Sequence, residues 1–520
     1  MNLRFFSLLL SMALLLAVSA CSTTAPGPDT RVPYEPPVQE ESTDREVPKE
    51  PEIGLEDPSS RSVAEVLELS RITTDDTQGL ALEIVRSLEP VSSGRLAGMI
   101  ESGTFDPEFT EWLELTQLVR RVMMKDAPVD AAARYWQDYH YGHAIDQAGF
   151  PGLVSSYADY FPVPSRVAVL LPTQGGLAAA GRAIRDGIIS AYMEQPGDTE
   201  VRFYPSGDTD ESVLAAYYRA LQEGATQIIG PLRMESTQVL ASLDHHETPV
   251  LLLNDPAISL EPGPGQVLKI SSLSLSQTEE AAAIAGRALE QDKTRAVVIV
   301  PENAWGQRIE TAFSAEFVQR GGQIPAGARF SPATSDHSAV LTRMLKIDES
   351  RQRKQDLQSR LGIPLQFEPI RRDDFDFIFL AASPLQGREL KPLLKFHDAG
   401  EVPVYAMGRV YSGRAGEGSD LDLDDVIFPI TPWQLEVSGK PLPALESLRL
   451  GSFGNLFALG RDAWQLLPWL PLLQKDPDLE FHGNTGSLSL KANGQLSRKP
   501  AWARFSQGLP VAYKLSLIHI

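Results

Sequence analysis

The segment DFDFIFLAASPLQGRELKPLLKFHDAGEVPVYAMGRVYSG, residues 374–413, decides the fold class. Residues 375–380 are a short apolar, aromatic-rich run bounded by charges and a proline, which predicts a strand buried on both faces. Apolar residues from Leu385 to Phe396 then recur at helical spacing, and Gly400 supplies a stop. A second strand is expected over residues 402–407. Strand, crossover helix and strand within roughly 35 residues predict a βαβ unit, which builds parallel sheets.

The same alternation runs through most of the chain after residue 165. Residues 166–172 predict a buried strand, Gly175-Gly176 a turn, and residues 177–192 a helix. Further strands are expected near residues 201–204, 227–230, 250–253, 295–300, 330 and 426–430, and further helices over 212–223, 235–243, 277–289, 307–320 and 457–470. The segment from residue 481 predicts a hairpin followed by a strand. Regular alternation of this length predicts two doubly wound sheets.

Residues 62–160 are helical in pattern, with apolar residues recurring at three and four. Asp106-Pro107-Glu108 is a typical helix start, with a cap, a proline and an early acid. Tyr135, Trp136 and Tyr139 form an apolar face, which we interpret as core rather than as a binding groove. The fold class expected is therefore α plus α/β: a helical domain of TPR-like hairpins over residues 61–160, then a two-lobed doubly wound domain over residues 161–514.

The first 60 residues predict a lipoprotein. A short basic start, an apolar run too short to span a membrane and Val18-Ser19-Ala20-Cys21 predict a signal peptide of residues 1–20, cut before a Cys21 that takes a diacylglycerol. A plain secretory signal with a chance cysteine is the alternative. Ser22 in place of an aspartate favours the outer membrane. Residues 22–60 hold eight prolines and ten acidic residues against three basic ones, which predicts an extended tether or a simple linker.

Composition excludes several classes of protein. Acidic residues number 68 and basic residues 47, and the net charge of −21 makes nucleic acid an unsuitable partner. One cysteine in 520 residues forms no intramolecular disulfide and no cysteine metal site. Residues 515–520 are what a transposon-end sequencing adapter would encode, so we expect them to carry no biology.

Several separated segments resemble the LppC/LpoA family. They are residues 377–413, LLPTQGGLAAAGRAIRDGIISAY at 170–192, Gly230-Pro231-Leu232, FALGRDAWQLLPWL at 457–470 and FHGNTGSLSLKANGQLSRKPAWARFSQG at 481–508. The resemblance implies an outer-membrane lipoprotein with a helical, TPR-like domain and a domain folded like type I periplasmic binding proteins. It also implies that the protein activates a bifunctional class A penicillin-binding protein.

No enzyme motif survives inspection, and no catalytic residue, metal ligand or cofactor is expected. The glycine-rich residues 413–418 lack the lysine of a P-loop, and neither a Gly-x-Ser-x-Gly elbow nor a His-Glu-x-x-His helix occurs. His245-His246-Glu247 is interpreted as a solvated helix end. The aspartates of residues 420–425 are interpreted as a solvated loop, since they lack the pattern of a calcium loop.

Two candidate sites remain. In two-lobed α/β binding proteins the ligand lies between the lobes, at the carboxyl ends of strands. The residues expected there are Thr173, Gln174, Pro231, Leu232, Asn303, Trp305 and Ser383. Asn303 and Trp305 could offer a hydrogen bond and a stacking face, or be ordinary loop and packing residues, and no ligand is identified.

The second candidate is a basic segment over residues 347–372. Arg351, Arg353 and Lys354 make it an exception in an acidic protein. It is either a solvated helical excursion or a contact surface for an acidic partner.

The favoured function is a lipid-anchored regulator that binds a class A penicillin-binding protein and raises its transpeptidase activity. A solute-binding lipoprotein of a transporter for amino acids or amides is the alternative. An envelope enzyme is disfavoured because no nucleophile or metal motif is found.

Overall fold

The computed structural model describes residues 61–161, 164–194, 196–261, 268–413, 420–435 and 453–513. The expectations for the signal peptide, Cys21 and the tether lie outside the described residues. So do those for residues 414–418 and 515–520.

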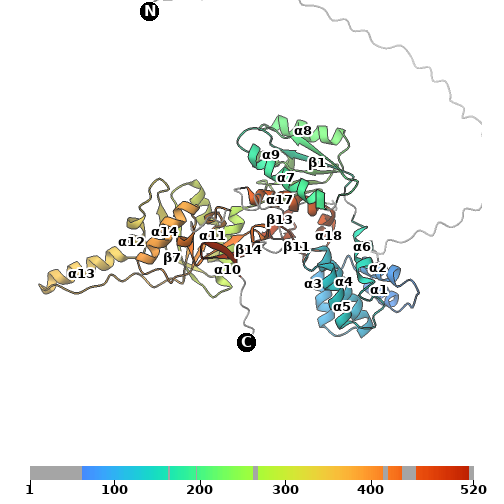
Figure 1. Cartoon of the computed structure of the whole chain (residues 1–520), viewed down its shortest axis with the longest axis horizontal. Helices are drawn as coiled ribbons and strands as arrows, with labels where there is room; N and C mark the ends of the chain where they lie inside the picture. Colours follow the sequence, from blue (N-terminus) through green and yellow to red (C-terminus); the bar gives the residue numbers. More distant parts are fainter. Residues whose placement is uncertain are drawn as a thin grey trace, which may run out of the picture. The chain divides into compact units, whose positions relative to one another are not determined.

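The helical pattern expected for residues 62–160 is confirmed (Figure 1). The helices are α1 (Val63–Ser70), α2 (Thr77–Ser87), α3 (Ser93–Glu101), α4 (Pro107–Met123), α5 (Val129–Tyr139) and α6 (Phe150–Ala158). The start of α4 follows the predicted cap, because the Asp106 carboxylate accepts a hydrogen bond from the Phe109 N–H at 2.9 Å and Pro107 is the first helical residue.

The aromatic face of α5 is only partly core. Trp136 is 1% exposed, and its indole N–H donates to the Ile145 carbonyl at 2.8 Å. Tyr135 and Tyr139 are 50% and 71% exposed, so the core interpretation is wrong for both. Residues four apart share a helix face, and the face of Tyr135 and Tyr139 differs from that of Trp136.

The first lobe is built on an eight-stranded sheet with the order β11-β12-β13-β5-β4-β3-β1-β2. Its strands from β13 to β2 pair in parallel, and β11, β12 and β13 pair antiparallel. The elements are β1 (Arg166–Leu171), α7 (Ala178–Glu194), β2 (Glu200–Pro205), α8 (Asp210–Gln222), β3 (Gln227–Ile229), α9 (Met234–Ala241), β4 (Val250–Leu252), β5 (Ile270–Leu273), α17 (Gly454–Gln465), η4 (Leu467–Trp469), α18 (Leu470–Lys475), β11 (Phe481–His482), β12 (Ser487–Leu490) and β13 (Gln495–Lys499).

Helices α7 and α17 pack through two glycines. A Cβ at Gly460 would lie 2.1 Å from the Ile184 carbonyl oxygen, and a Cβ at Gly187 would lie 2.1 Å from that of Phe457. The expectation of one amphipathic helix over residues 457–470 is wrong in two respects. Helix α17 ends at Gln465, and η4 and α18 follow it. It is also buried almost all round, because it contacts both α7 and α15.

The second lobe is built on a seven-stranded sheet with the order β15-β14-β10-β9-β8-β6-β7. Its elements are α10 (Gln277–Leu289), β6 (Arg295–Pro301), α11 (Ala304–Gln319), β7 (Gln323–Phe330), α12 (Ser338–Met344), α13 (Ile347–Leu361), β8 (Phe377–Leu380), α14 (Pro384–Phe396), β9 (Val404–Ala406), η2 (Gly408–Val410), η3 (Leu421–Leu423), β10 (Val426–Ile430), α15 (Pro432–Leu435), β14 (Ala501–Ser506) and β15 (Leu509–Ala512). The expected pair of sheets is therefore confirmed.

The predicted βαβ unit of residues 374–413 is β8, α14 and β9. The two strands pair in parallel, with Ile378 opposite Val404. Phe377 and Phe379 enter one hydrophobic cluster of the lobe, and Ile378 and Leu380 enter another. Strand β8 is thus buried on both faces, as its unbroken apolar run predicts.

The covering helix α14 buries a narrower stripe than expected. Leu390 and Leu394 are fully buried, while Leu385 and Phe396 are 63% and 78% exposed. Helical spacing explains the difference, because residues 385 and 396 point away from the stripe that contains residues 390 and 394.

The imidazole of His143, between α5 and α6, packs edge-on against Trp112 at 4.4 Å between ring centroids. Burial lowers its pKa from 6.5 to about 4. In the unfolded chain His143 therefore takes up a proton near pH 6.5, whereas in the folded chain it does so only near pH 4. The neutral ring stabilises the fold fully above pH 6.5, and this contribution is lost as the pH falls toward 4.

We therefore expect the free energy of unfolding to fall between pH 6.5 and pH 4, with a smaller fall in a His143→Phe variant, whose ring does not titrate. Urea unfolding at several pH values measures both slopes. The exposed His245, replaced by Gln, is the matched control. Equal slopes for the wild type and His143→Phe would contradict this prediction.

Candidate functional site

The predicted cleft residues of the first lobe follow β1 and β3. Thr173 and Gln174 follow β1 and are exposed, whereas Pro231 and Leu232 follow β3 and are buried. Leu232 belongs to the hydrophobic core of this lobe. Thr173 and Gln174 are thus the pair on this side with solvent-facing polar groups.

Two predicted residues of the second lobe act as helix caps. The Asn303 side-chain oxygen accepts from the Gly306 N–H at 2.8 Å at the start of α11. The Ser383 hydroxyl oxygen accepts from the Gln386 N–H at 3.4 Å, and the Gln386 side chain accepts from the Ser383 N–H at 3.0 Å. Their polar groups are used by their own helices.

Trp305 is the predicted residue around which other functional groups gather. Its indole N–H donates to the Gln277 side-chain oxygen at 2.6 Å, and the Arg409 guanidinium lies 5.1 Å from its ring centroid. The first turns of α10 and α11 and the short helix η2 after β9 therefore meet at one edge of the second sheet. An indole face and a guanidinium there can hold a planar or anionic group.

A largely buried carboxyl group lies next to this cluster, since the Glu280 side chain is 15% exposed. The Glu280 carboxylate accepts from the Gly408 N–H at 2.8 Å and lies 3.8 Å from the Arg498 guanidinium. Burial raises the pKa of Glu280, which Arg498 opposes. Sequence reasoning missed Gln277, Glu280 and Arg409. The available signal was the position of Gly408-Arg409 directly after the strand predicted over residues 402–407. Asn303 likewise follows a predicted strand, the one over residues 295–300.

The two sites interpreted as solvated are partly buried. His246 is 7% exposed, and its ring lies 3.3 Å from the Tyr217 hydroxyl, because helix α9 ends at Ala241 and the following loop folds inward. Asp420 is fully buried and pairs with Arg388 at 2.7 Å. The solvated interpretation is wrong for both residues. Among the described residues no group of three or more potential metal ligands occurs.

The basic residues of the partner-surface hypothesis all lie on α13. Arg351 and Arg353 are exposed and pair with Asp348 and Glu349 at 3.7 and 3.9 Å. The Lys354 ammonium lies 5.5 Å from the Phe367 ring centroid. All three side chains therefore lie at the surface of the protein.

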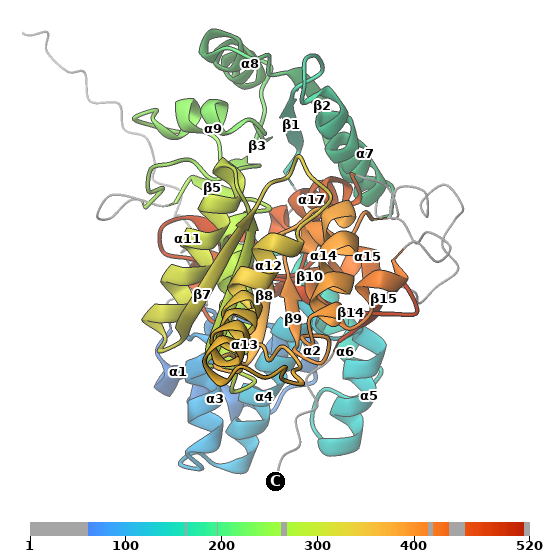
Figure 2. The same ribbon diagram turned by 90° about the vertical axis from the view of Figure 1, so that its left-hand side faces the viewer.

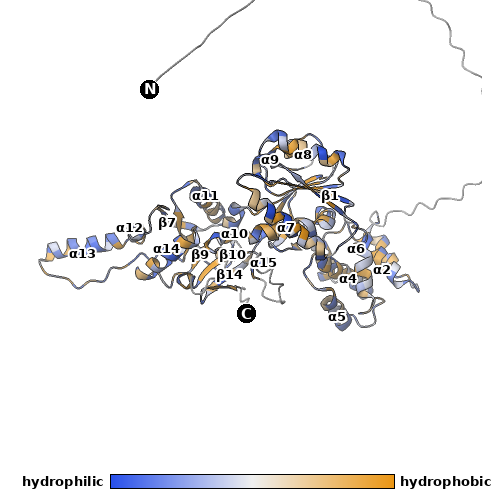
Figure 3. Cartoon of the chain, turned by 45° about the horizontal axis from the view of Figure 1, so that its top comes forward, coloured by the Kyte–Doolittle hydropathy of each residue, from blue (hydrophilic) through white to orange (hydrophobic). Residues whose placement is uncertain are grey.

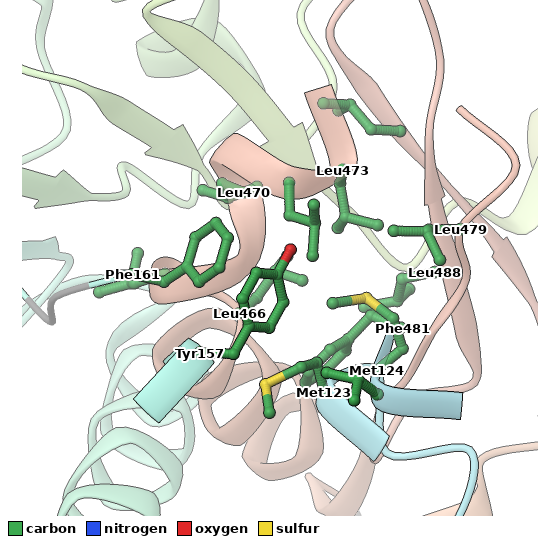
Figure 4. Packing of buried hydrophobic residues seen from close by; sticks show 14 of the residues in the cluster. Met123, Met124, Tyr157, Phe161, Leu466, Leu470, Leu473, Leu479, Phe481 and Leu488 are labelled. Carbon is green, nitrogen blue, oxygen red and sulfur yellow. The ribbon is translucent and has the colours of Figure 1, made fainter. Parts of the chain in front are cut away.

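The helical part and the first lobe share one hydrophobic core. A single cluster of buried residues runs from Val66 in α1 to Leu496 in β13. In Figure 4, side chains from the ends of α4 and α6 pack against side chains of the segment from α17 to β12. The labelled residues are Met123, Met124, Tyr157, Phe161, Leu466, Leu470, Leu473, Leu479, Phe481 and Leu488.

A buried ion pair crosses the same junction. The Arg120 guanidinium of α4 lies 2.9 Å from the Asp476 carboxylate, and both side chains are 0% exposed. Arg120 also donates to the Leu88 and Val91 carbonyls, at 2.7 and 2.8 Å. Asp476 accepts from the Ser93 N–H and hydroxyl, at 2.9 and 2.7 Å. Each charge is therefore hydrogen-bonded to several groups, while the Arg120 Nε–H stays buried without a hydrogen-bond partner.

Two further contacts border the ion pair. Lys475 pairs with Glu89 at 2.9 Å, and the His482 N–H donates to the Met124 carbonyl at 2.8 Å. A cavity of about 810 Å³ lies next to this junction and is lined by Lys125, Trp464 and Trp469, among others. The signal for the junction was Arg120 itself, a charge inside the apolar stripe of α4.

None of the helices in the described ranges has the length and apolarity that crossing a membrane requires.

The family description "LppC putative lipoprotein" matches residues 61–508. A relative is the penicillin-binding protein activator LpoA of Photobacterium profundum, 25% identical over 418 residues, which cover 76% of this chain and 64% of that protein. Another is the penicillin-binding protein activator LpoA of Klebsiella pneumoniae, 28% identical over 59% of this chain and 44% of that protein. The chain thus spans less than two thirds of the length of these relatives.

Solved structures show the same fold. Full-length LpoA of Haemophilus influenzae matches with a TM-score of 0.53 at 19% identity, over 86% of this chain and 77% of that one. The C-domain of the same protein, described as a regulator of PBP1A, matches with a TM-score of 0.52 at 21% identity, over 67% of this chain and 100% of that one. A Rhodospirillum rubrum protein described as a "putative branched-chain amino acid ABC transporter" gives 0.50 at 16% identity, over 67% and 99%.

Fold and junction together define a two-lobed protein with a fold like that of periplasmic binding proteins and a helical part fused to its first lobe. The match over residues 61–508 spans both parts. The chain belongs to the LppC family of lipoproteins.

Removing one partner of the ion pair should destabilise the junction strongly. We expect Arg120→Met or Asp476→Asn to lower the free energy of unfolding by about 3–5 kcal/mol, because each leaves a buried group without its partner. Arg121→Gln is the matched control, since Arg121 pairs with Asp126 on the surface and its loss costs less than about 1 kcal/mol. Urea unfolding measures all three, and equal losses for Arg120 and Arg121 variants would contradict the role of the ion pair.

Proposed function

We propose that this chain is an outer-membrane lipoprotein that binds a bifunctional class A penicillin-binding protein and stimulates its transpeptidase activity. The observation that carries the proposal is the family match over residues 61–508, which includes the helical part and both lobes. The names of the relatives support it, since they are penicillin-binding protein activators. The structural relative from Haemophilus influenzae is described as a regulator of PBP1A.

The proposed anchor is Cys21, acylated after removal of residues 1–20. Several acyl chains, at about 0.8 kcal/mol for each buried methylene, hold such a protein firmly in a membrane. Residues 22–60 then serve as the tether, whose extended length is on the order of 120 Å. Ser22 supports the outer membrane as the destination.

Stimulation has a simple physical basis in this proposal. The protein binds the active conformation of the synthase more tightly than the inactive one, and the shift of the conformational equilibrium cannot exceed this difference in binding free energy. The fused core and the buried ion pair support the role, because they hold the helical part and the first lobe together as one body that can present a defined surface to the synthase.

The proposed function is tested by peptidoglycan synthesis with the class A penicillin-binding protein of the same organism. The soluble unit of residues 56–520 is added, and cross-linked products are scored. We expect cross-linking to rise roughly fivefold or more, a typical size for coupling between two bound proteins. Absence of both binding and stimulation would contradict the proposal.

Two controls complete the test. The same unit without the synthase should leave peptidoglycan unchanged, and cleavage or cross-linking there would point to an enzyme. A synthase with an inactivated transpeptidase site should give no cross-links with or without the unit.

Solute binding is the second candidate function, and one observation favours it. The Trp305 ring, the Arg409 guanidinium and the Gln277 amide gather at the carboxyl ends of β6 and β9, where two-lobed binding proteins hold ligands. For this second function we propose a ligand cleft between the lobes, lined by Thr173, Gln174, Pro231, Leu232, Asn303, Trp305 and Ser383.

A ligand of this cleft should stabilise the protein against heat. An amino acid or amide at about 100 times its Kd would add about 2.7 kcal/mol to the free energy of unfolding, and Trp305→Ala would remove the effect. Thermal unfolding with a panel of amino acids and amides measures it. A panel without any shift would contradict solute binding and leave the activator proposal standing.

A further inference from the structure

Helix α13 of the second lobe is almost entirely exposed. Of its 15 residues, only Ile347 and Ser350 are buried, and both lie in its first turn. Figure 1 shows α13 extending beyond α12 and α14, and Figure 2 looks almost along its axis. The helix adds little to the hydrophobic core of the lobe.

The chain after α13 runs back alongside the helix. Gly362 ends the helix in the left-handed conformation, with a φ of 66°. Ser350 accepts a hydrogen bond from the Ile370 N–H at 3.1 Å, and Lys354 lies over the Phe367 ring. We define the α13 arm as residues 347–372. A helix of this length is marginal in water without packing, so these contacts keep it formed.

The middle of α13 is a basic region in an acidic protein. Residues 351–360 contain one acidic residue, Asp356, and four basic ones, Arg351, Arg353, Lys354 and Arg360. The whole chain has 47 basic and 68 acidic residues. An acidic surface is therefore attracted to the arm and repelled by most of the remaining molecule, which orients the encounter.

Apolar side chains share one face of the arm with these charges. Arg353, Leu357, Arg360 and Leu361 follow the spacing i, i+4, i+7 and i+8, which places them along one stripe. Leu357 and Leu361 are 49% and 53% exposed, and Ile363 just beyond the helix is 56% exposed. Figure 3 shows orange positions between the blue ones along α13. Leu357 and Leu361, four residues apart on this face, are the kind of apolar anchor that helices insert into grooves, and the two arginines flank them.

The ion pairs within α13 do not compete with such binding. Arg353 lies 3.9 Å from Glu349, and both side chains are more than half exposed. Surface pairs of this kind contribute little. The guanidinium can therefore pair with a partner's carboxylate at small cost, and arginine is enriched at the energetic centres of interfaces.

We propose that the α13 arm is the docking element of this protein, and that it inserts the Arg353–Leu357–Arg360–Leu361 stripe into an apolar groove rimmed by carboxylates on a folded partner protein. This inference rests on the proposed function, in which the partner is the class A penicillin-binding protein. The arm itself includes Asp348, Glu349, Asp356 and Glu368, so it lacks the uniformly basic face that an anionic membrane would favour.

The test compares binding of the unit of residues 56–520 to the class A penicillin-binding protein across three double variants. Arg353→Glu with Arg360→Glu reverses the charges of the stripe, and Leu357→Ser with Leu361→Ser removes its apolar part. Arg308→Glu with Val318→Ser is the matched control on α11 of the same lobe, where both residues are exposed. Every changed side chain is exposed, so we expect all variants to keep the thermal unfolding midpoint of the wild type.

We expect each α13 variant to weaken binding about tenfold or more, while the control stays within about twofold of the wild type. The charge variant should also bind with a weaker dependence on salt, because its attraction to the groove rim is removed.

Three results would overturn the inference, and they are distinguishable. Wild-type protein that does not bind the synthase contradicts the proposed function and the arm together. Wild-type binding that both α13 variants retain within about twofold contradicts the arm alone. Vesicles containing phosphatidylglycerol that bind the wild type but not the charge variant, with synthase binding unchanged, assign the arm to a lipid surface instead.

Discussion

The desolvated contact between Arg120 and Asp476 constrains the molecule more than any other single interaction described here. Both side chains are inaccessible to water, and a buried charge without its partner costs several kcal/mol. If α4 and the segment after α18 moved apart, Arg120 and Asp476 would lose each other as partners, which is energetically unfavourable. The surrounding apolar contacts act in the same direction, because they form one continuous core from α1 to β13. The helical part is therefore an extension of the first lobe.

The two lobes are joined differently. The chain passes from one sheet to the other between β5 and α10, between α15 and α17, and between β13 and β14. Ion pairs border the last of these crossings, with Lys491 at 2.8 Å from Glu279 and Arg498 at 3.8 Å from Glu280. A conformational change between the lobes involves the points where the chain crosses, among them the described links between β5 and α10 and between β13 and β14. The α13 arm belongs to the second lobe, and the fused helical part belongs to the first.

The strand, helix and strand of residues 374–413 were predictable because each has its own local pattern, and so was the cap at Asp106. Features that depend on distant partners were not. Strands β12, β13 and β14 follow one another closely, yet β13 and β14 belong to different sheets, which no hairpin pattern reveals. The pair of Arg120 and Asp476 joins residues 356 positions apart. Burial of His246 depends on Tyr217, and the candidate cluster at Trp305 depends on Arg409, both distant in sequence.

Native-state hydrogen exchange tests the fused core most directly. Backbone amides of α4 and of α18 are followed by mass spectrometry in the unit of residues 56–520. We expect the slowest amides of both helices to open with the same free energy, because one core and one ion pair hold them together. An α4 that opens at a clearly lower free energy, while α18 stays protected, would contradict the account and make the helical part an independent domain.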